Sequence, residues 1–416
     1  MSKSAITGAA ALKVPQFRSF LTARFFLTMS FQMQSVAVGW QVYNITHDPL
    51  ALGMIGLAEA IPFLSLVLFA GHWADIYIRK KLISISVVLF VLCSATFLLF
   101  SVRPSLLPAV HPEYMFYLVF AFAGVARAIA GPSIQATLPQ ILKRELYANG
   151  AAWNSSFWQI AAVTGPALGG LIYGFAGQSQ TYLCVLVLCL SSLFFFSRLP
   201  VFPPARQRSE PVFASLAGGL KFVYKQPVIL GALSLDLFAV LFGGAVALLP
   251  VFANEILHTG PQGLGILRAA PSTGAVITAL IVTRHAPMRN SGKILLAVVA
   301  LFGLCMIGFA LSDLFWLSFI LLFLSGLFDG VSVLIRSTII QLFTPDEMRG
   351  RVASVNSIFI GSSNEIGAFE SGLMARMMGL IPSVVFGGSM TLVCTGIVSK
   401  LAPTLRKLHL EEHVDT

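Results

Sequence analysis

Long runs of apolar residues follow one another along this chain, separated by shorter polar segments. Each run has roughly the 20 residues that a helix needs to cross about 30 Å of hydrocarbon. The pattern predicts twelve spans, at approximately 20–43, 50–70, 82–102, 113–136, 151–175, 179–198, 227–254, 262–283, 294–312, 314–337, 351–376 and 380–402. The sequence therefore indicates an all-α membrane protein with twelve transmembrane helices.

The charges support this interpretation and add an orientation. Only 11% of the 416 residues are charged, with 27 Lys and Arg against 17 Asp and Glu. Most of the cations fall in alternate connections, and placing both termini in the cytoplasm leaves only Arg103 and Arg376 outside. We therefore expect a multi-pass plasma membrane protein, in the bacterial inner membrane, with both termini cytoplasmic. The same distribution makes the basic charge a signal of topology and anionic lipid, and argues against a nucleic-acid partner.

The polar segment 198–227 divides the spans six and six. It predicts an N-terminal six-helix bundle at 1–198, a cytoplasmic linker at 199–226 and a C-terminal bundle with its tail at 227–416. Within the linker, the apolar spacing over 213–224 is typical of an amphipathic surface helix. Similar stretches recur in the two halves, such as "EAIP" at 59–62 and "RAAP" at 268–271. We interpret them as two pseudo-symmetric copies of one six-helix unit.

The sequence contains no pattern of residues that indicates a cofactor or a metal site. The five cysteines all fall in apolar spans without the spacing of a zinc or redox motif, and we interpret them as packing residues. We expect no cofactor and no metal site.

Three stretches, "FRSFLTARFF", "THDPLALGMIGLAEAIPF" and "GHWADIYIRKK", carry a family resemblance. The whole chain resembles the major facilitator superfamily, within its twelve-helix branch of enterobactin exporters and macrolide efflux pumps. The third stretch is similar to the superfamily signature between helices 2 and 3, with Gly71, Asp75, Arg79 and Lys80 as matching residues. The resemblance implies two six-helix bundles in the major facilitator fold.

In that signature, Asp75 carries the implied conformational role. The resemblance implies that its carboxylate faces the start of the eleventh helix, near Arg349 and Arg351, and clamps the two halves. Such contacts are worth on the order of 1 kcal/mol and can break during a transport cycle. In the simpler alternative, the cations only hold this loop in the cytoplasm.

An arginine inside the fourth span, Arg127, begins "RAIAG" and matches a second superfamily signature. A guanidinium within a bilayer requires water or a partner, so it should line a cavity. The resemblance implies that it tunes an acid for proton exchange. The repeat places Asp329 opposite it, and Asp329, Ser332 and Arg336 share one face of the tenth helix.

Other acids within spans are further candidates for proton coupling. Glu59 aligns with Arg268 in the repeat, and either a static ion pair or a coupling role fits that pair. Asp236 and Glu370 are candidates because desolvation favours the neutral carboxyl, whereas we interpret Glu365 as a structural partner.

The fifth span contains "TGPALGG", and its Gly165, Pro166, Gly169 and Gly170 match a signature that accompanies antiporters in the superfamily. Ala161 stands where the wider pattern has another glycine. Ordinary close packing of helices is the alternative interpretation.

A polar stripe along the first span completes the candidate site. It consists of Arg24, Thr28, Gln32 and Ser35. The resemblance implies that helices 1, 4, 7 and 10 line a central cavity, to which Arg127 and Arg336 would also belong. Four aromatic residues could stack on a substrate, although aromatic residues on a transmembrane helix more often face lipid or the core: Trp40, Tyr43, Phe122 and Phe238.

Together these features predict a secondary transporter, and not an enzyme, that exports a small amphipathic compound by alternating access in exchange for protons. Its partners would be the substrate, protons and the bilayer, and it would act as a monomer. A facilitator or an importer is the first alternative. A sensor or a polytopic enzyme is the second, although the chain lacks Asp-Asp-x-x-Asp, Gly-x-Ser-x-Gly and phosphate-loop motifs.

Overall fold

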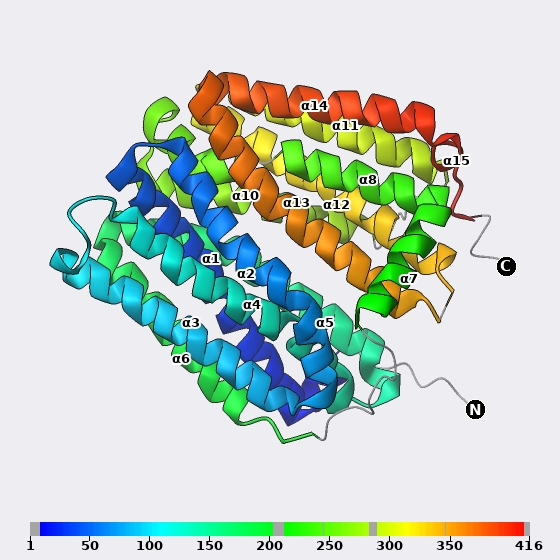
Figure 1. Ribbon diagram of the computed structural model, residues 1–416, viewed down its shortest axis with the longest axis horizontal. Helices are drawn as coiled ribbons and strands as arrows, with labels where there is room; N and C mark the ends of the chain where they lie inside the picture. The colour runs from blue at the N-terminus through cyan, green and yellow to red at the C-terminus, as the bar shows by residue number, and fades with distance from the viewer. Residues whose placement is uncertain (1–8, 203–211, 244, 283–288, 346, 412–416) are drawn as a thin grey trace. The chain divides into compact units, whose positions relative to one another are not determined.

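The computed structural model describes residues 9–202, 212–243, 245–282, 289–345 and 347–411, and this part of the chain contains helices and no strand (Figure 1). The first half holds α1 (Pro15–Thr46), α2 (Pro49–Ile76), α3 (Arg79–Val102), α4 (Glu113–Ile141), α5 (Tyr147–Ala176) and α6 (Gln178–Ser197). The second holds α7 (Val212–Lys225), α8 (Pro227–Phe242), α9 (Leu249–Val251), α10 (Gly260–Val282), α11 (Ser291–Ala310), α12 (Phe315–Phe343), α13 (Arg349–Met378), α14 (Leu380–Leu401) and α15 (Pro403–Arg406). Short turns, η1 (Ala11–Lys13), η2 (Pro104–Leu106), η3 (Arg144–Leu146), η4 (Ala245–Leu248) and η5 (Phe252–Ile256), complete the elements. Residues 203–211 of the predicted linker and the two predicted cytoplasmic chain ends, 1–8 and 412–416, lie outside the described residues.

Ten helical segments in the described residues are long and apolar enough to cross a membrane. Neither α1 nor α13 is among them, although they have 32 and 30 residues. Both carry several charged and amide side chains, which lower their mean hydropathy. The all-helical class is confirmed. That α1 and α13 also cross the membrane, which would give twelve crossings, stays a prediction.

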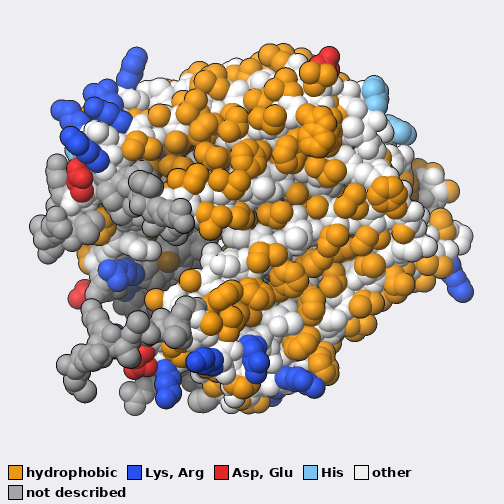
Figure 2. Space-filling model, turned by 180° about the vertical axis from the view of Figure 1, so that it is seen from behind, with side chains coloured by type: hydrophobic (Ala, Val, Ile, Leu, Met, Phe, Trp, Pro, Cys, Tyr) orange, Lys and Arg blue, Asp and Glu red, His pale blue; other side chains and the backbone are white. Residues whose placement is uncertain are grey.

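Hydrophobic side chains cover the middle of the face shown in Figure 2, and Lys and Arg side chains lie toward its margins. Many of the exposed large residues come from the apolar helices, for example Leu92, Leu118 and Leu304. A soluble protein rarely exposes so much apolar surface, so these side chains form the surface that contacts lipid.

The chain forms two compact units. The first consists of Met1–Val38 with Ile61–Ser209, and the second of Gly39–Ala60 with Glu210–Thr416. We name Gly39–Ala60 the crossover segment, because it comes from the end of α1 and the start of α2 but belongs to the second unit. The predicted domains, 1–198, 199–226 and 227–416, stay a prediction, and the crossover segment falls within the first of them.

In the first unit, α3 packs against α4 and α6. Aromatic rings fill this junction: Phe97 stacks on Phe116 and on Tyr182, with ring centroids 5.7 and 5.6 Å apart. Phe97 and Tyr182 are fully buried. In the second unit, α11 packs in the same way against α12 and α14. The same neighbours therefore recur at equivalent places, as a duplicated six-helix unit predicts.

The run predicted as a single span at 227–254 is not one regular helix. α8 ends at Phe242, and the chain continues through η4, the single turn α9 and the π-helical turn η5. Gly243 disfavours continuation of the helix after Phe242, and Pro250 removes one backbone donor. Interrupted spans and π-helical turns often occur at functional sites, and this one borders a cavity.

The amphipathic helix predicted over 213–224 corresponds to α7. Val223 is buried in a core cluster with residues of α8 and α13, whereas Leu220 and Tyr224 are exposed. Its location at a membrane face stays a prediction.

Candidate functional site

A cavity of about 320 Å³ lies inside the second unit, walled by α8, η4, α10, α11, α12 and α13. Most of its wall is apolar. Four charged residues also line it: Asp236, Arg268, Asp329 and Glu365. This volume and mixed lining are typical of a small-molecule site. Two of the predicted coupling acids, Asp236 and Asp329, therefore face one internal space.

Arg336 on α12 connects these two acids. Its Nη1 forms an ion pair with Asp236 Oδ2 on α8, and its Nη2 lies 3.7 Å from Asp329 Oδ1. Its Nε also donates to the backbone carbonyl of Ser332, at 3.3 Å. Within the polar face predicted for this helix, the Arg336 guanidinium thus contacts both Asp329 and Ser332.

The two carboxylates differ in accessibility. The side chain of Asp236 is only 8% exposed, and the side chain of Asp329 is 47% exposed. Asp236 is therefore held closely against Arg336, whereas Asp329 is reachable from water in the cavity.

A second charged group surrounds Arg268 on α10. Its electrostatic partners are Glu365 on α13 and then Glu59 on α2. Glu59 is 5% exposed and belongs to the crossover segment. The structure thus brings the aligned pair Glu59 and Arg268 together and adds Glu365, while a role in coupling stays a prediction.

The crossover segment is attached to the second unit by polar contacts at its outer part. The Tyr43 hydroxyl donates to Glu255 Oε1 in η5. Asp48 Oδ2 lies 3.2 Å from Arg376 Nη1 on α13. Because Tyr43 is fully buried, it is not available to stack on a ligand here, and Trp40 is only 6% exposed.

Small residues bring the same segment close to α13. A methyl group built on Gly53 would lie 3.1 Å from the backbone of Ala368 and Phe369, and one built on Gly372 would lie 2.9 Å from the Pro49 carbonyl. This glycine-mediated packing is typical of closely apposed transmembrane helices.

In the first unit, two intramembrane arginines have partners within their own unit. Arg24 Nη1 donates to Asn154 Oδ1 on α5 at 2.7 Å. Arg127 lies over the ring of Phe63, 4.5 Å from its centroid, which is a cation–π contact. The predicted pair of Arg127 with Asp329 joins residues of different units and stays a prediction.

The rest of the polar stripe on α1 is partly buried. It consists of Thr28, Gln32 and Ser35. Its neighbour Gln34 is buried and accepts a hydrogen bond from Ser94 Oγ at 2.9 Å, in the core of the first unit. The stripe's role in a substrate cavity stays a prediction.

The loop between α2 and α3 joins several helix ends. Arg79 Nε donates to the Ala74 carbonyl at 3.0 Å, and its Nη1 donates to the Ala136 carbonyl on α4 at 2.7 Å. Lys80 Nζ donates to the carbonyls of Ser197 and Leu199 at the end of α6, at 2.7 and 2.6 Å. The last carbonyls of a helix lack partners within it, so Arg79 completes the end of α2 and Lys80 the end of α6, whereas Ala136 lies five residues before the end of α4.

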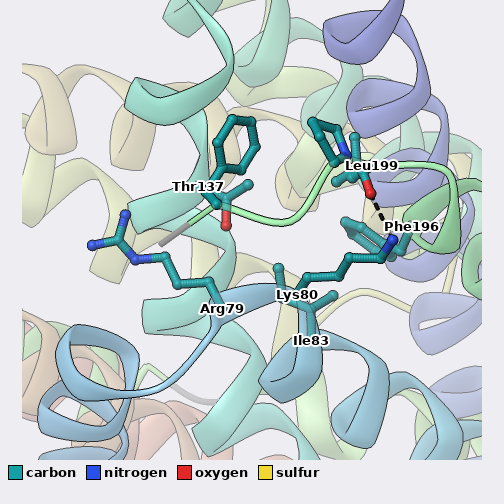
Figure 3. A pocket seen from close by; sticks show the side chains of 8 residues that line it. Arg79, Lys80, Ile83, Thr137, Phe196 and Leu199 are labelled. Carbon is teal, nitrogen blue, oxygen red and sulfur yellow. Dashed lines mark hydrogen bonds between the residues drawn. The ribbon is translucent and has the colours of Figure 1, made fainter. Parts of the chain in front are cut away.

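Figure 3 shows the two side chains extending in opposite directions, with the Lys80 ammonium at the Leu199 carbonyl. The space between them holds about 10 Å³, which is too small for a ligand. Asp75 Oδ1 lies 3.9 Å from Arg79 Nη2, and a methyl group built on Gly71 meets nothing within 4 Å. Both the clamp and the simpler retention of the loop remain compatible with this geometry.

The motif glycines of α5 face α1. A methyl group on Gly165 would lie 2.8 Å from Gln32 Cβ, and one on Gly169 would lie 3.0 Å from Met33 Cα. Pro166 and Gly170 are buried beside them. In the second unit Gly367, which aligns with Gly165 in the repeat, lies against Leu241 and Val240 of α8 in the same manner. The motif therefore permits close packing, and a direction-setting role stays a prediction.

Replacing Gly169 by valine is expected to lower the stability of the purified protein by about 1–3 kcal/mol, because the backbone of α1 must move away. Thermal unfolding in detergent, followed by size-exclusion chromatography, measures the effect. Gly396→Val is the matched control, because nothing lies within 4 Å of a methyl group built there. Equal midpoints for the two variants would contradict close packing at α1.

Sequence reasoning missed several partners in these groups. Glu370 lies on α13 and is not among the described residues that line the cavity. Phe63, Asn154 and Glu255 were not identified as partners, and only the polarity of the last two gave a signal. Asn364 also lines the cavity. It stands directly before Glu365 in the sequence of α13, so this polar residue could have been predicted as part of the site.

Comparisons with known proteins agree with this architecture. The family described as transmembrane secretion effector matches residues 6–414. Enterobactin exporter EntS from Shigella dysenteriae is 27% identical over 377 residues, which cover 90% of this chain and 88% of that protein. EntS from Escherichia coli O81 is 28% identical with the same coverage.

Solved structures show the same fold at low identity. A peptide transporter POT in complex with alafosfalin has a TM-score of 0.73 at 13% identity, covering 96% of this chain and 98% of its own. A bacterial homologue of the human lysosomal transporter Spinster has a TM-score of 0.70, also at 13% identity, with the same coverage. The family match spans nearly the whole sequence, and the chain therefore belongs to the transmembrane secretion effector family of the major facilitator superfamily.

Proposed function

We propose that this protein exports a small amphipathic compound across the bacterial inner membrane by alternating access, in exchange for protons. Its relatives include enterobactin exporters, and a siderophore-like or drug-like compound fits that relationship. Both termini would lie in the cytoplasm, and the protein would act as a monomer.

The observation that carries the proposal is the sharing of Arg336 between Asp236 and Asp329 at the wall of a cavity. A buried guanidinium stabilises carboxylates near it, and the more distant carboxylate is the easier one to protonate. Asp329 is also the more accessible of the two. We therefore assign the exchanged proton to Asp329, and assign to Asp236 the role of holding Arg336.

Proton uptake by Asp329 would change the electrostatic attraction that acts on the Arg336 guanidinium. When Asp329 is ionised, the guanidinium is attracted to both α8 and its own helix; when Asp329 is protonated, only Asp236 attracts it. A difference of this kind between two conformations is what couples proton binding to a population shift. Substrate binding in one conformation would shift the population back.

The other predicted residues would act around this centre. Arg127 and Glu59 would contribute to the charge balance, and Glu370 would be a secondary proton acceptor. The loop of Gly71, Asp75, Arg79 and Lys80 would bias the two conformations.

Transport into proteoliposomes tests the proposal. With enterobactin outside and an acidic lumen, we expect uptake above the external concentration, and we expect a protonophore to abolish it. Asp329→Asn should remove this accumulation while leaving downhill exchange of substrate. Uptake that follows only the enterobactin gradient, with or without the protonophore, would indicate a facilitator instead.

A further inference from the structure

The chain after α14 folds back onto the second unit. Residues 403–410, which we name the docked segment, cross the start of α11. The Gly292 N–H donates to the Leu408 carbonyl at 3.2 Å, and the Leu410 N–H donates to Ser291 Oγ at 3.1 Å. The docked segment is therefore bonded to the first residues of α11.

Leucine side chains anchor the docked segment. Leu405, Leu408 and Leu410 are buried and belong to a core cluster with residues of α8, α11, α12 and α13. A methyl group built on Gly292 would overlap the Leu405 carbonyl, so the two backbones touch. Charged side chains on the docked segment and on the start of α11 are consequently held near one another.

Exposed cations gather at this end of the unit, and we name them the basic patch. They come from the start of α11, the end of α14 and the docked segment: Arg289, Lys293, Lys400, Arg406 and Lys407. Figure 2 shows Lys and Arg side chains gathered at its upper left margin, the end at which α15 lies in Figure 1.

The charge of the basic patch is not neutralised within the described part of the chain. None of its five side chains forms an ion pair with a described residue. Glu411, which follows the docked segment, is the acid nearest to the patch in the sequence. Cations that are held together repel one another, and this repulsion favours the binding of an anion.

The depth of the basic patch indicates which anion. α11 and α14 meet at Gly303, where a methyl group would lie 3.0 Å from the Gly388 carbonyl. Lys293 is ten residues from Gly303, and Lys400 is twelve residues from Gly388. At about 1.5 Å per residue, both cations stand roughly 15–18 Å from this crossing, which is about half the hydrocarbon thickness. They therefore lie at the level of the lipid phosphates.

An apolar strip leads from the basic patch along α14. It consists of Val393, Ile397 and Leu401, which are all at least 50% exposed and lie on one face of the helix. Lys400 of the patch directly precedes Leu401. A soluble anion would use the cations alone, whereas a phospholipid would use the cations and the strip.

We infer that the basic patch binds an anionic phospholipid of the bilayer, with its phosphodiester among the cations and its acyl chains along the apolar strip of α14. Clusters of Lys and Arg beside a transmembrane helix are typical of such recognition. The headgroup would offset the repulsion between the cations and hold the docked segment on α11. This site is separate from the cavity and does not depend on the proposed export.

Lipid titration of the purified full-length protein in detergent tests the inference. The probes are dioctanoyl phosphatidylglycerol, dioctanoyl phosphatidylethanolamine and glycerol 3-phosphate. The two lipids share acyl chains and differ in headgroup charge, and the third probe has a phosphate without acyl chains. We expect phosphatidylglycerol to slow tryptic cleavage after Arg406 and Lys407, because cleavage requires release of the docked segment. Half-maximal protection should need at least about tenfold less phosphatidylglycerol than either other probe.

Variants locate the site. Arg289→Gln with Lys293→Gln removes the two cations beside α11 and leaves both tryptic sites. It should weaken phosphatidylglycerol binding about tenfold or more, and without lipid it should be cleaved more slowly than the wild type, because less charge repels the docked segment. The matched control is Lys143→Gln with Arg144→Gln, two exposed cations between α4 and α5. This control should bind phosphatidylglycerol as the wild type does.

The inference would be overturned by equal responses to the two lipids, or by an equal response to glycerol 3-phosphate, which would indicate a site for soluble anions. A phosphatidylglycerol affinity that the α11 variant leaves unchanged would also overturn it. The same holds if the α11 variant and the control lower that affinity equally, because diffuse attraction to any basic surface would then explain the binding.

Discussion

Replacing Arg336 by methionine is expected to destabilise the protein by about 3–5 kcal/mol and to abolish transport. The substitution removes the cation that holds Asp236, whose side chain is only 8% exposed, and leaves that carboxylate buried without its partner. It also removes the positive charge that both carboxylates, of Asp236 and Asp329, contact. Yield of monodisperse protein and its thermal midpoint measure the loss.

An exposed ion pair provides the matched control. Arg376 pairs with Asp48 at 3.2 Å, but its side chain is 59% exposed. Exposed pairs are worth about 0–1 kcal/mol, so Arg376→Met should lower the midpoint only slightly. The double variant Asp236→Asn with Arg336→Met should recover much of the stability lost in the single variant, because no charge is then left unpaired at that pair. Similar losses for the two arginine variants would contradict a buried pair at the centre of the second unit.

Replacing Gly326 by valine is expected to prevent the second unit from folding. A methyl group built on Gly326 would lie 1.9 Å from the Pro271 carbonyl, and one built on Gly274 would lie 2.1 Å from the Phe323 carbonyl. The backbones of α10 and α12 therefore touch at their crossing, and neither glycine has a flexible neighbour that could give way. The cost should be about 3 kcal/mol or more, because a whole helix must shift.

Expression as a fluorescent fusion, followed by size-exclusion chromatography, distinguishes this outcome from simple loss of activity. Gly326→Val should appear as aggregate, and Gly396→Val on α14 should elute as the native protein does. Gly326→Ala should also lower the thermal midpoint, because its methyl group is the one that would lie 1.9 Å from the Pro271 carbonyl. A valine variant that elutes normally and retains its midpoint would show that α10 and α12 are farther apart than described.

The helices were predictable because membrane crossing imposes a length and an apolar composition that are visible without any tertiary information. The charged residues of the site were predictable for the same reason, since an acid or arginine within such a run requires a partner. Asp236, Asp329 and Arg336 were all identified in this way.

The partners were harder to predict, because they depend on how each helix is rotated about its axis. Repeat symmetry suggested Arg127 for Asp329, whereas within its own unit Asp329 lies 3.7 Å from Arg336, seven residues along the same helix. The cation that pairs with Asp236 could equally have been Arg268 on composition alone. Only the packing of α8 against α12 selects Arg336.

In the loop between α2 and α3, too, the residues were predictable from the sequence and their partners were not. Its cations were identified by their motif, and helix-end chemistry requires donors for free carbonyls. Which carbonyls they reach depends on tertiary placement, which brings Ala136 of α4 and Ser197 of α6 to this loop. The break in the seventh predicted span could have been predicted, because two consecutive glycines stand there in the sequence.

The crossover segment has a consequence for how the protein is made. A ribosome releases Tyr43 long before Glu255, which lies 212 residues farther along the chain, and Arg376 follows later still. During that interval Glu59 has entered the bilayer without Arg268, and Gly53 has no α13 to pack against. The nascent first half therefore completes its folding only after most of the second half has been inserted, and until then the insertion machinery or annular lipid must shield the Glu59 carboxylate.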